Sequence, residues 1–307
     1  MWNSILRRLI ASVFVVWGSL TLVFFIMNVL PGDPAELIVG QTATEETIAK
    51  LHESLGLNRP LLTQYTDYMS GIVRGDFGVS FISKEPVLHR LLEQFPATLT
   101  LTAASVIVAL ALGITLGILS AVYRNRLLDY VIRTLTLFSI SMPTFWLGIL
   151  LILIFSVSLR WLPAIGNGSF EQLVLPACCL GFACSGALAR MVRNSILEVL
   201  GEPFVVTLRS KGLSERSVLY RHILRNALIP TITLTGILIG ELLSGSVVTE
   251  TVFSRQGIGR VVVDAIMQKD IPVVQAAILF ASIFYILVNL AVDLSYSYVD
   301  PRVRSKA

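Results

Sequence analysis

The chain alternates between long apolar stretches and shorter polar ones. A helix that crosses the apolar core of a bilayer needs about 20 predominantly apolar residues. Stretches of this kind occur at roughly residues 9–30, 97–122, 134–159, 173–189, 227–249 and 273–292. All of them lack charged residues except 227–249, which contains Glu241. Because the period-two alternation of strands is absent, the pattern predicts an all-α integral membrane protein with six transmembrane helices.

Basic residues between the apolar stretches predict the orientation. The two termini and the connections 123–133 and 190–226 hold 15 of the Lys and Arg residues, and the alternate connections hold nine. Basic residues favour the cytoplasmic side, so we expect both termini in the cytoplasm. The apolar run after Arg7 and Arg8 exceeds the about 7–15 residues of a signal peptide and is expected to remain as a span.

The acidic segment 31–96 is expected to lie outside and to be ordered rather than a loose loop. Thr42 and Glu45 fit a capping box for a helix that ends near Gly56, and Pro60 suits the start of a second helix. We therefore predict an ordered external segment after the first span.

Two further patterns concern the second apolar stretch. The residues from Pro86 to Phe95 have the apolar spacing of a helix that lies on the membrane surface before this span. Gly113 and Gly117 form a pair of small residues that suits close contact with another helix.

Composition supports the membrane class and narrows the chemistry. Hydrophobic residues make up 54% of the chain and charged residues 14%, whereas soluble domains are about 25% charged. The net charge of +4 does not indicate a nucleic-acid partner. The three cysteines in CCLGFAC have no histidine beside them, so we expect small buried apolar side chains rather than a metal site. The histidines at positions 52, 89 and 222 lie outside the spans.

Common catalytic and nucleotide-binding motifs are absent from the sequence. None of the patterns G-x-x-x-x-G-K-[ST], H-E-x-x-H and G-x-S-x-G occurs. We expect no catalytic residue, no metal ligand and no cofactor bound by this chain. Active transport would then need a partner that supplies the nucleotide site.

The polar segment 202–230 lies between two apolar stretches and carries helix signals of its own. Pro203 suits a first helical turn, Gly212 suits a left-handed helix end, and Ser214 is a candidate N-cap for a second, amphipathic helix. A short helix, a glycine turn and a longer helix form an element that can fit a partner's groove and move with it. The alternative is a basic loop that only fixes topology.

This segment resembles the EAA loop of binding-protein-dependent ABC importer permeases. Val206, Thr207 and Leu208 stand where that pattern has an acid and two alanines, and the later I-x-L-P spacing is not kept. The segment instead follows the KGL…RH.LRNAL.P pattern of the peptide/nickel subgroup. The matching residues are Lys211, Gly212, Leu213, Arg221, His222, Leu224 to Leu228 and Pro230.

Motifs of the same subgroup extend over the whole chain. They are LPGDPA (30–35), LGLNRPLLTQY (55–65), GDFGVSF (75–81), PATLTLT (96–102), SMPTFWLG (141–148), VFSRQGIGR (252–260) and DPRVR (300–304). Gln256 replaces the proline of many relatives, which is expected to alter turn rigidity rather than function. The chain is similar to the B permease subunit of a dipeptide, oligopeptide or nickel transporter.

The resemblance implies a fold, a domain plan and a set of partners. It implies the type I ABC importer fold in the cell inner membrane. Residues 1–95 would form the first transmembrane helix and the external segment, 96–298 a five-helix core with a cytoplasmic coupling loop at 198–228, and 299–307 a cytoplasmic tail. The partners would be a homologous second permease, two ATPase subunits that use ATP and Mg²⁺, and an extracytoplasmic substrate-binding protein that delivers small peptides.

The resemblance also singles out candidate site residues. Those expected to transmit the motion of the ATPase are Thr207, Leu208, Arg209, Ser210, Lys211, Gly212 and Leu213. Leu208, Gly212 and Leu213 are expected to provide the fit, because exposed ion pairs contribute only about 0–1 kcal/mol each. Glu241 lies near the centre of its span, where an acid usually faces the bundle interior or water. It either lines the translocation path or is a structural partner of another polar group.

Other functions remain open at this stage. A nickel or metal-chelate importer is the nearest alternative, because the region from SMPTFWLG to LRWLPAIGNG resembles nickel permeases equally well. A membrane scaffold or sensor subunit that binds a partner without moving a solute is an alternative of another class. An intramembrane enzyme has little support, because the spans contain no paired catalytic residues.

Overall fold

The computed structural model describes residues 2–29, 33–39 and 44–299, and most of these are helical. Contacts divide the chain into two compact units. Unit 1 combines residues 1–97 with 256–286, and unit 2 combines residues 98–255 with 287–307.

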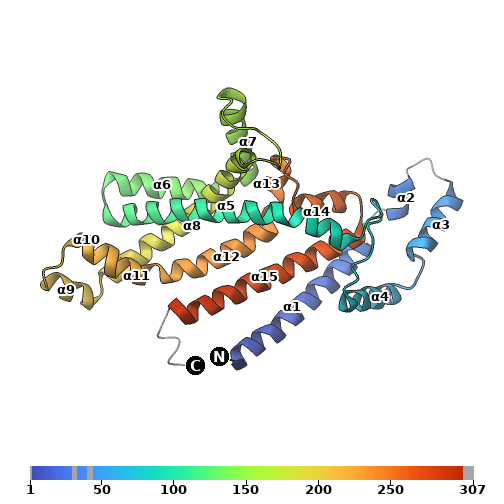
Figure 1. Cartoon of the computed structure of the whole chain (residues 1–307), viewed down its shortest axis with the longest axis horizontal. Coiled ribbons are helices and arrows are strands. Elements are labelled where there is room, and N and C mark those ends of the chain that lie inside the picture. Colours follow the sequence, from blue (N-terminus) through green and yellow to red (C-terminus); the bar gives the residue numbers. More distant parts are fainter. Residues whose placement is uncertain (1, 30–32, 40–43, 300–307) are drawn as a thin grey trace. The chain divides into compact units, whose positions relative to one another are not determined.

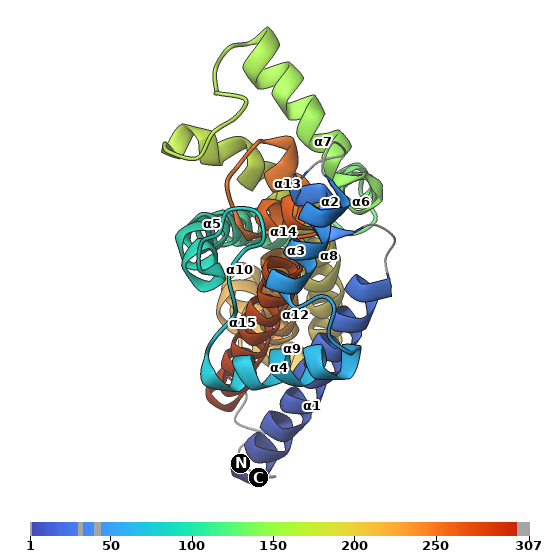
Figure 2. The same cartoon turned by 90° about the vertical axis from the view of Figure 1, so that its right-hand side faces the viewer.

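Unit 1 has a core of aliphatic side chains. Its helices are α1 (Trp2–Val29), α2 (Pro34–Val39), α3 (Glu45–Leu55), α4 (Leu61–Arg74), the start of α5 (Val87–Val122), α14 (Ile258–Met267) and most of α15 (Ile271–Val299). Val87 and Leu91 of α5 pack with Ala265 of α14 and Val273 of α15, and all four are fully or almost fully buried. Helix α4 crosses α1 (Figures 1 and 2), where the Tyr65 hydroxyl lies 2.8 Å from Thr21 Oγ1.

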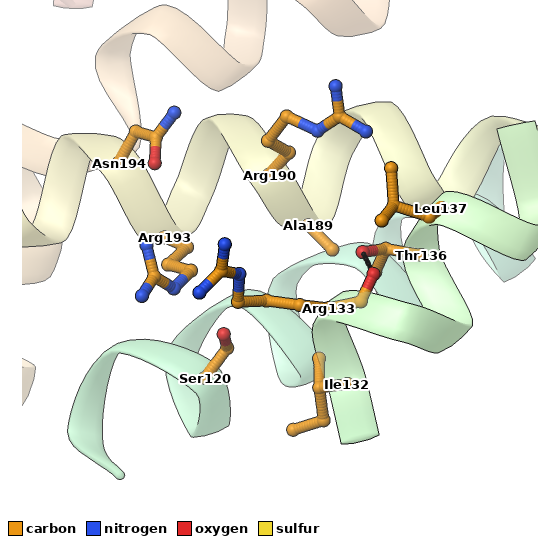
Figure 3. Close-up of a pocket in the computed structure, with 9 residues that line it drawn as sticks. All are labelled: Ser120, Ile132, Arg133, Thr136, Leu137, Ala189, Arg190, Arg193 and Asn194. Carbon is orange, nitrogen blue, oxygen red and sulfur yellow. Dashed lines mark hydrogen bonds between the residues drawn. The ribbon is translucent and has the colours of Figure 1, made fainter. Parts of the chain in front are cut away.

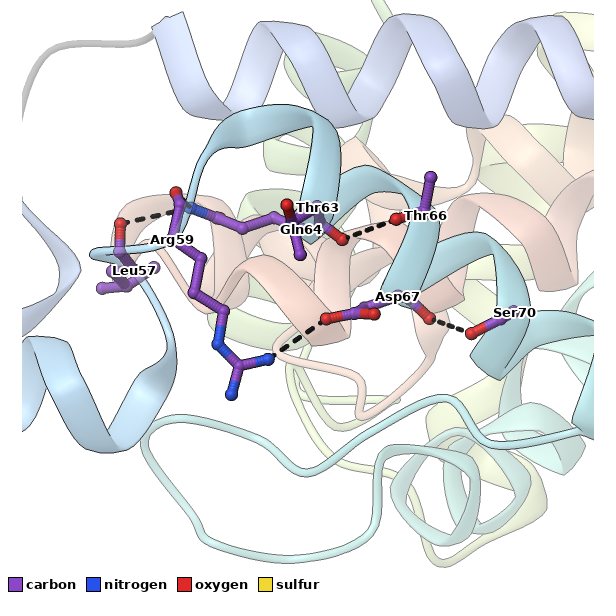
Figure 4. Close-up of polar contacts among 7 residues, drawn as sticks. All are labelled: Leu57, Arg59, Thr63, Gln64, Thr66, Asp67 and Ser70. Carbon is purple, nitrogen blue, oxygen red and sulfur yellow. Dashed lines mark hydrogen bonds and ion pairs between the residues drawn. The ribbon is translucent and has the colours of Figure 1, made fainter.

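Helices α3 and α4 confirm much of the expected order after the first span. Helix α3 ends at Gly56, which has a φ of +69°, and Pro60 is the N-cap of α4. The Gln64 amide donates to the Leu57 and Arg59 carbonyls between the helices (Figure 4). The expected cap residue Thr42 lies outside the described residues.

The predicted capping box does not form at the start of α3. The N-cap of α3 is Thr44, whose side chain makes no capping hydrogen bond. Helix α3 begins at Glu45, so Glu45 stands in the first turn and is too early to bond back to the N-cap.

A buried carboxylate in unit 1 fastens the turn that follows α4. Asp270 is fully buried and accepts hydrogen bonds from the Ser80 hydroxyl at 2.5 Å and from the Phe81 N–H at 2.9 Å. The Arg90 guanidinium lies 3.8 Å from the same carboxylate. Residues 80–81 are thereby tied to the connection between α14 and α15.

The segment from Pro86 to Phe95 is not a separate surface helix, which corrects the sequence prediction. It forms the first turns of α5, which runs without a break through Pro96 for 36 residues. Val87 and Leu91 use their apolar spacing to pack into the core of unit 1.

Unit 2 contains the remainder of α5 and most of the other apolar helices. These are α6 (Leu127–Ser141), α7 (Thr144–Leu151), the π-helical η1 (Ile152–Ser158), α8 (Phe170–Leu200), α9 (Pro203–Ser210), α10 (Glu215–Ser217), the π-helical η2 (Val218–Ile223), α11 (Leu224–Ala227), α12 (Ile229–Gly245) and α13 (Val247–Val252). Helix α6 packs against α8, and in Figure 1 α9 lies beyond the end of α8.

The third predicted span is bent rather than straight. Helix α6 ends at Ser141 and α7 starts at Thr144, with an angle of 107° between α6 and the helix formed by α7 and η1. The backbone of Met142 is extended, as expected for a residue that precedes a proline. Among the described residues, four helices are long and apolar enough to span a membrane, or up to six if each bent pair counts as one span. The count of six thus stays a prediction.

Gly113 and Gly117 allow α5 to approach α8, as the sequence predicted. A Cβ atom on Gly113 would lie 2.6 Å from the Leu188 Cβ, and one on Gly117 would lie 2.7 Å from the Val192 Cβ. Real Cβ atoms do not come so close, so a larger residue at either position would force the helices apart. Contact of this kind is typical of small residues between membrane helices.

Candidate functional site: the coupling segment

Residues 207–213, which we call the coupling segment, contain the end of α9 and the turn that follows it. Helix α9 starts with Pro203 in its first turn after the extended N-cap Glu202. Proline is suited to this position because its missing N–H would have no partner inside the helix. The predicted short helix is therefore confirmed, with its end at Ser210.

The turn after α9 has the hydrogen bonds of a Schellman motif. The Leu213 N–H donates to the Leu208 carbonyl at 3.4 Å, and the Gly212 N–H donates to the Arg209 carbonyl at 2.9 Å. Gly212 has a φ of +77°, which confirms the predicted left-handed helix end. These two bonds satisfy carbonyl groups that the end of a helix leaves without partners.

An ion pair closes the other side of the same turn. Arg209 donates from Nε and Nη2 to the two carboxylate oxygens of Glu215, at 2.8 and 3.0 Å. The hydrogen bonds to Glu215 raise the pKa of the Arg209 guanidinium. Ser214 caps α10 by accepting from the Ser217 N–H, as predicted. Arg209, one of the residues expected to transmit the motion of the ATPase, thus binds Glu215 within this chain.

A hydrophobic cluster anchors the coupling segment to the rest of unit 2. Val205 is fully buried and packs with Val192 and Ile196 of α8 and with Val218 and Ile223 of η2. The partly buried side chains packed on this cluster include those of Leu208 and Leu213. Both leucines thus have an internal partner, although they were expected to provide the fit to another subunit.

The exposed side of α9 combines apolar and polar side chains. Phe204 is 38% exposed and Val206 is 61% exposed. Thr207, Ser210 and Lys211 are also exposed. The exposed large apolar side chains of α9 are therefore those of Phe204 and Val206, which lie just before the candidate residues 207–213.

Glu241 lies apart from the coupling segment. It is exposed on the surface of α12, and its carboxylate is near enough to the Cys184 thiol of α8 for an electrostatic interaction. About 20 Å of helix separates it from Leu228, at 1.5 Å per residue. Between α11 and α12 the chain bends by 49°.

Sequence reasoning missed a buried polar network at α13. Glu250 is fully buried and accepts from the Thr98 hydroxyl of α5 at 2.7 Å and from the Ser246 hydroxyl at 2.9 Å. Arg255 donates to Thr100 Oγ1 at 3.1 Å. The run ETVFSR, with opposite charges five residues apart, was the only sequence sign of this network.

A second buried pair joins α6 to α8. Arg193 donates from Nε and Nη2 to the Asp129 carboxylate at 3.0 Å each, and Asp129 is fully buried. The Ser120 hydroxyl and the Asn125 N–H also donate to Asp129. Arg193 is one of the basic residues of 190–226 that predict the orientation, and its sequence neighbourhood does not indicate this pair.

Possible metal ligands do not gather in the described part of the chain. No group of three or more His, Cys, Asp or Glu residues among the described residues is placed to hold a metal ion. Cys179 is buried, and its thiol lies 3.3 Å from the Thr144 carbonyl of α7.

Family models match nearly the whole chain. The binding-protein-dependent transport system inner membrane component matches residues 113–305, and the N-terminal model of the same kind of membrane component matches residues 1–102. The chain belongs to this family of transport permeases. The resemblance seen in its motifs is thereby confirmed.

Curated relatives agree with the family over the full length of the chain. The glutathione transport system permease protein GsiC of Salmonella choleraesuis is 43% identical over 306 residues, which is 100% of each chain. GsiC of Escherichia coli K12 is 42% identical over the same length. These relatives are permease subunits and not enzymes.

Solved structures agree on the fold. An inward-facing structure of the MetNI methionine ABC transporter has a TM-score of 0.60 and 22% identity, and the match covers 70% of this chain and 98% of that chain. A second crystal form gives a TM-score of 0.61 at 21% identity. Together with the family, these matches identify a membrane permease subunit of an ABC importer.

Proposed function

We propose that this permease forms half of the translocation path for small peptides, with glutathione as the first substrate to test. The observation that carries this proposal is the 42–43% identity to glutathione permeases over the whole chain. Glutathione is a tripeptide, so it falls in the small-peptide class that the sequence motifs suggested. A homologous second permease would form the other half of the path.

The energy for transport would come from other subunits. We propose that two ATPase subunits bind ATP and Mg²⁺ at the cytoplasmic side and that an extracytoplasmic substrate-binding protein delivers the ligand. This chain would bind no cofactor itself. The distribution of basic residues supports an orientation with both termini and the coupling segment in the cytoplasm.

The coupling segment would pass the ATPase motion into the spans. A partner groove would hold the exposed side of α9, where Phe204 and Val206 lie. Because Val205 is buried against α8 and η2, displacement of α9 would move these helices with it. Helix η2 is π-helical, and such turns are frequent at functional sites.

Glu241 would line the path. It is exposed on unit 2 in a helix whose other residues are uncharged, and an acid within a membrane span usually faces water or a bundle interior. There it could bind the amino group of a peptide.

Reconstituted transport tests the proposal. Vesicles would contain the complete complex, with ATP on the side of the ATPase subunits and the binding protein on the opposite side. Labelled glutathione, a dipeptide or a nickel chelate would be added on the side of the binding protein. We expect ATP-dependent uptake of glutathione, no uptake without the ATPase subunits, and reduced uptake in Glu241→Gln despite normal assembly. Uptake of the nickel chelate alone would overturn the peptide assignment. A complex that hydrolyses ATP but accumulates none of the three solutes would favour a scaffold or sensor.

A further inference from the structure

A cavity between α6 and α8 is lined by three arginines. Its volume is about 240 Å³, and Arg133 of α6 and Arg190 and Arg193 of α8 all contribute to its wall. Figure 3 shows these side chains with Ser120 and Thr136 around the same space. We call this cavity the arginine pocket.

The positive charge of the arginine pocket is only partly balanced within the chain. Asp129 neutralises Arg193, and its remaining capacity is used by Ser120 and by the backbone of Asn125. Arg133 and Arg190 are exposed. Among the described residues, neither guanidinium has an ion-pair partner, and none of the residues that line the pocket is acidic. The pocket therefore holds an excess of about two positive charges, which favours an anion.

The surroundings indicate what kind of anion fits. The same helix α6 presents apolar side chains at its surface, with Val131, Leu137 and Phe138 each 55% exposed. A ligand that suits both features has an anionic group beside apolar chains. The volume is below the about 300–1,000 Å³ of sites that enclose a drug-sized ligand, so it would take a head group while the chains stay outside.

We propose that the arginine pocket binds the phosphate of an anionic phospholipid head group. Basic pockets between membrane helices on the cytoplasmic side bind such head groups. Guanidinium groups suit a phosphate because their planar N–H groups match its oxygens in pairs. The assignment to the cytoplasmic leaflet rests on the proposed orientation of the chain, whereas the binding itself does not.

Native mass spectrometry of the purified complex tests the proposal. The complex would be depleted of lipid and then titrated with phosphatidylglycerol or with phosphatidylcholine of the same acyl chains. We expect tighter retention of phosphatidylglycerol by the wild type. Each of Arg133→Gln and Arg190→Gln should weaken the affinity for phosphatidylglycerol roughly 5-fold, because one basic residue near a lipid surface usually changes the binding constant by about this factor. The double variant should weaken the affinity about 30-fold.

Two controls separate a lost site from a damaged fold. Arg124→Gln removes an exposed charge from the neighbouring turn between α5 and α6, outside the pocket lining, and should bind phosphatidylglycerol like the wild type. Arg133→Lys with Arg190→Lys keeps both charges and should recover most of the affinity. Wild-type affinity in the double Gln variant, or equal retention of both lipids by the wild type, would overturn the proposal.

Two further measurements distinguish the source of the anion. Inorganic phosphate that displaces phosphatidylglycerol at equal concentration would mean a site for free phosphate and would overturn the lipid assignment. An acidic side chain of the second permease could also fill the pocket. This alternative predicts that a cysteine in Arg190→Cys forms a disulfide with a cysteine of the second permease and that the assembled complex retains no lipid. Both results together would overturn the proposal as well.

Discussion

Unit 2 contains two bidentate arginine–carboxylate pairs with similar bond lengths and opposite surroundings. Arg193 binds Asp129 at 3.0 Å, with the two side chains 16% and 0% exposed. Arg209 binds Glu215 at 2.8 and 3.0 Å, with the side chains 43% and 72% exposed. Burial, and not hydrogen-bond geometry, therefore decides what such a pair contributes to the fold. The first pair holds α6 and α8 together, and the second closes a turn at the surface.

The buried pair should show the largest effect. Asp129→Asn leaves the Arg193 guanidinium without its charged partner, and breaking a buried pair in this way costs about 3 kcal/mol or more. We expect a lower melting temperature of the purified complex and less permease in the membrane. Ser120→Ala, which removes only a neutral donor to Asp129, is the matched control and should have a clearly smaller effect. Equal melting of Asp129→Asn and wild type would show that the pair is not structural.

The glycine turn beside the exposed pair should show an intermediate effect. Gly212→Val puts a β-branched side chain at a φ of +77°, a conformation that costs an ordinary residue about 1–2 kcal/mol. Nothing lies within 4 Å of the added Cβ atom, so the cost comes from the backbone alone.

The expected result for Gly212→Val is normal membrane insertion with lost ATP-dependent uptake, measured in reconstituted vesicles. Gly212→Asn tolerates the left-handed conformation better and should retain more uptake than Gly212→Val. Gly18→Ala in α1, which also meets nothing within 4 Å, serves as a control for loss of a glycine as such. Full uptake by Gly212→Val would remove the turn from the coupling mechanism.

The exposed pair should show the smallest effect. Glu215→Gln removes the charge that Arg209 binds, and exposed pairs of this kind add little because water and salt screen them. We expect an unchanged melting temperature and a change in uptake of less than about 3-fold at physiological salt. A large loss of uptake would mean that the pair itself, rather than the shape of the turn, is needed in the complex.

Local rules were sufficient to predict the coupling segment from the sequence. Pro203, Gly212 and Ser214 each act through their own backbone or through residues a few positions away, so their identity is enough to place a helix start, a left-handed end and an N-cap. The partners of Leu208 and Leu213 were not predictable in this way, because the cluster that covers them comes from α8 and η2.

Features that depend on distant partners escaped prediction. Asp129 and Arg193 are 64 residues apart in sequence, and nothing in their neighbourhoods shows that they meet. Pro143 marks a break in the third apolar stretch, but a proline alone does not specify the angle of 107° between the two helices. Conversely, the boundary expected between a helix at residues 86–95 and the span at 97–122 is absent, because α5 continues through Pro96.

The glycine contacts between α5 and α8 limit how this permease can change shape. Two backbones without room for a single carbon atom between them at Gly113 and Gly117 cannot slide or rotate past each other without a collision. We therefore expect α5 and α8 to move together as one rigid body during the transport cycle. The conformational changes that open and close the path would then occur by hinge bending near residues 142 and 228, where the helices are already bent.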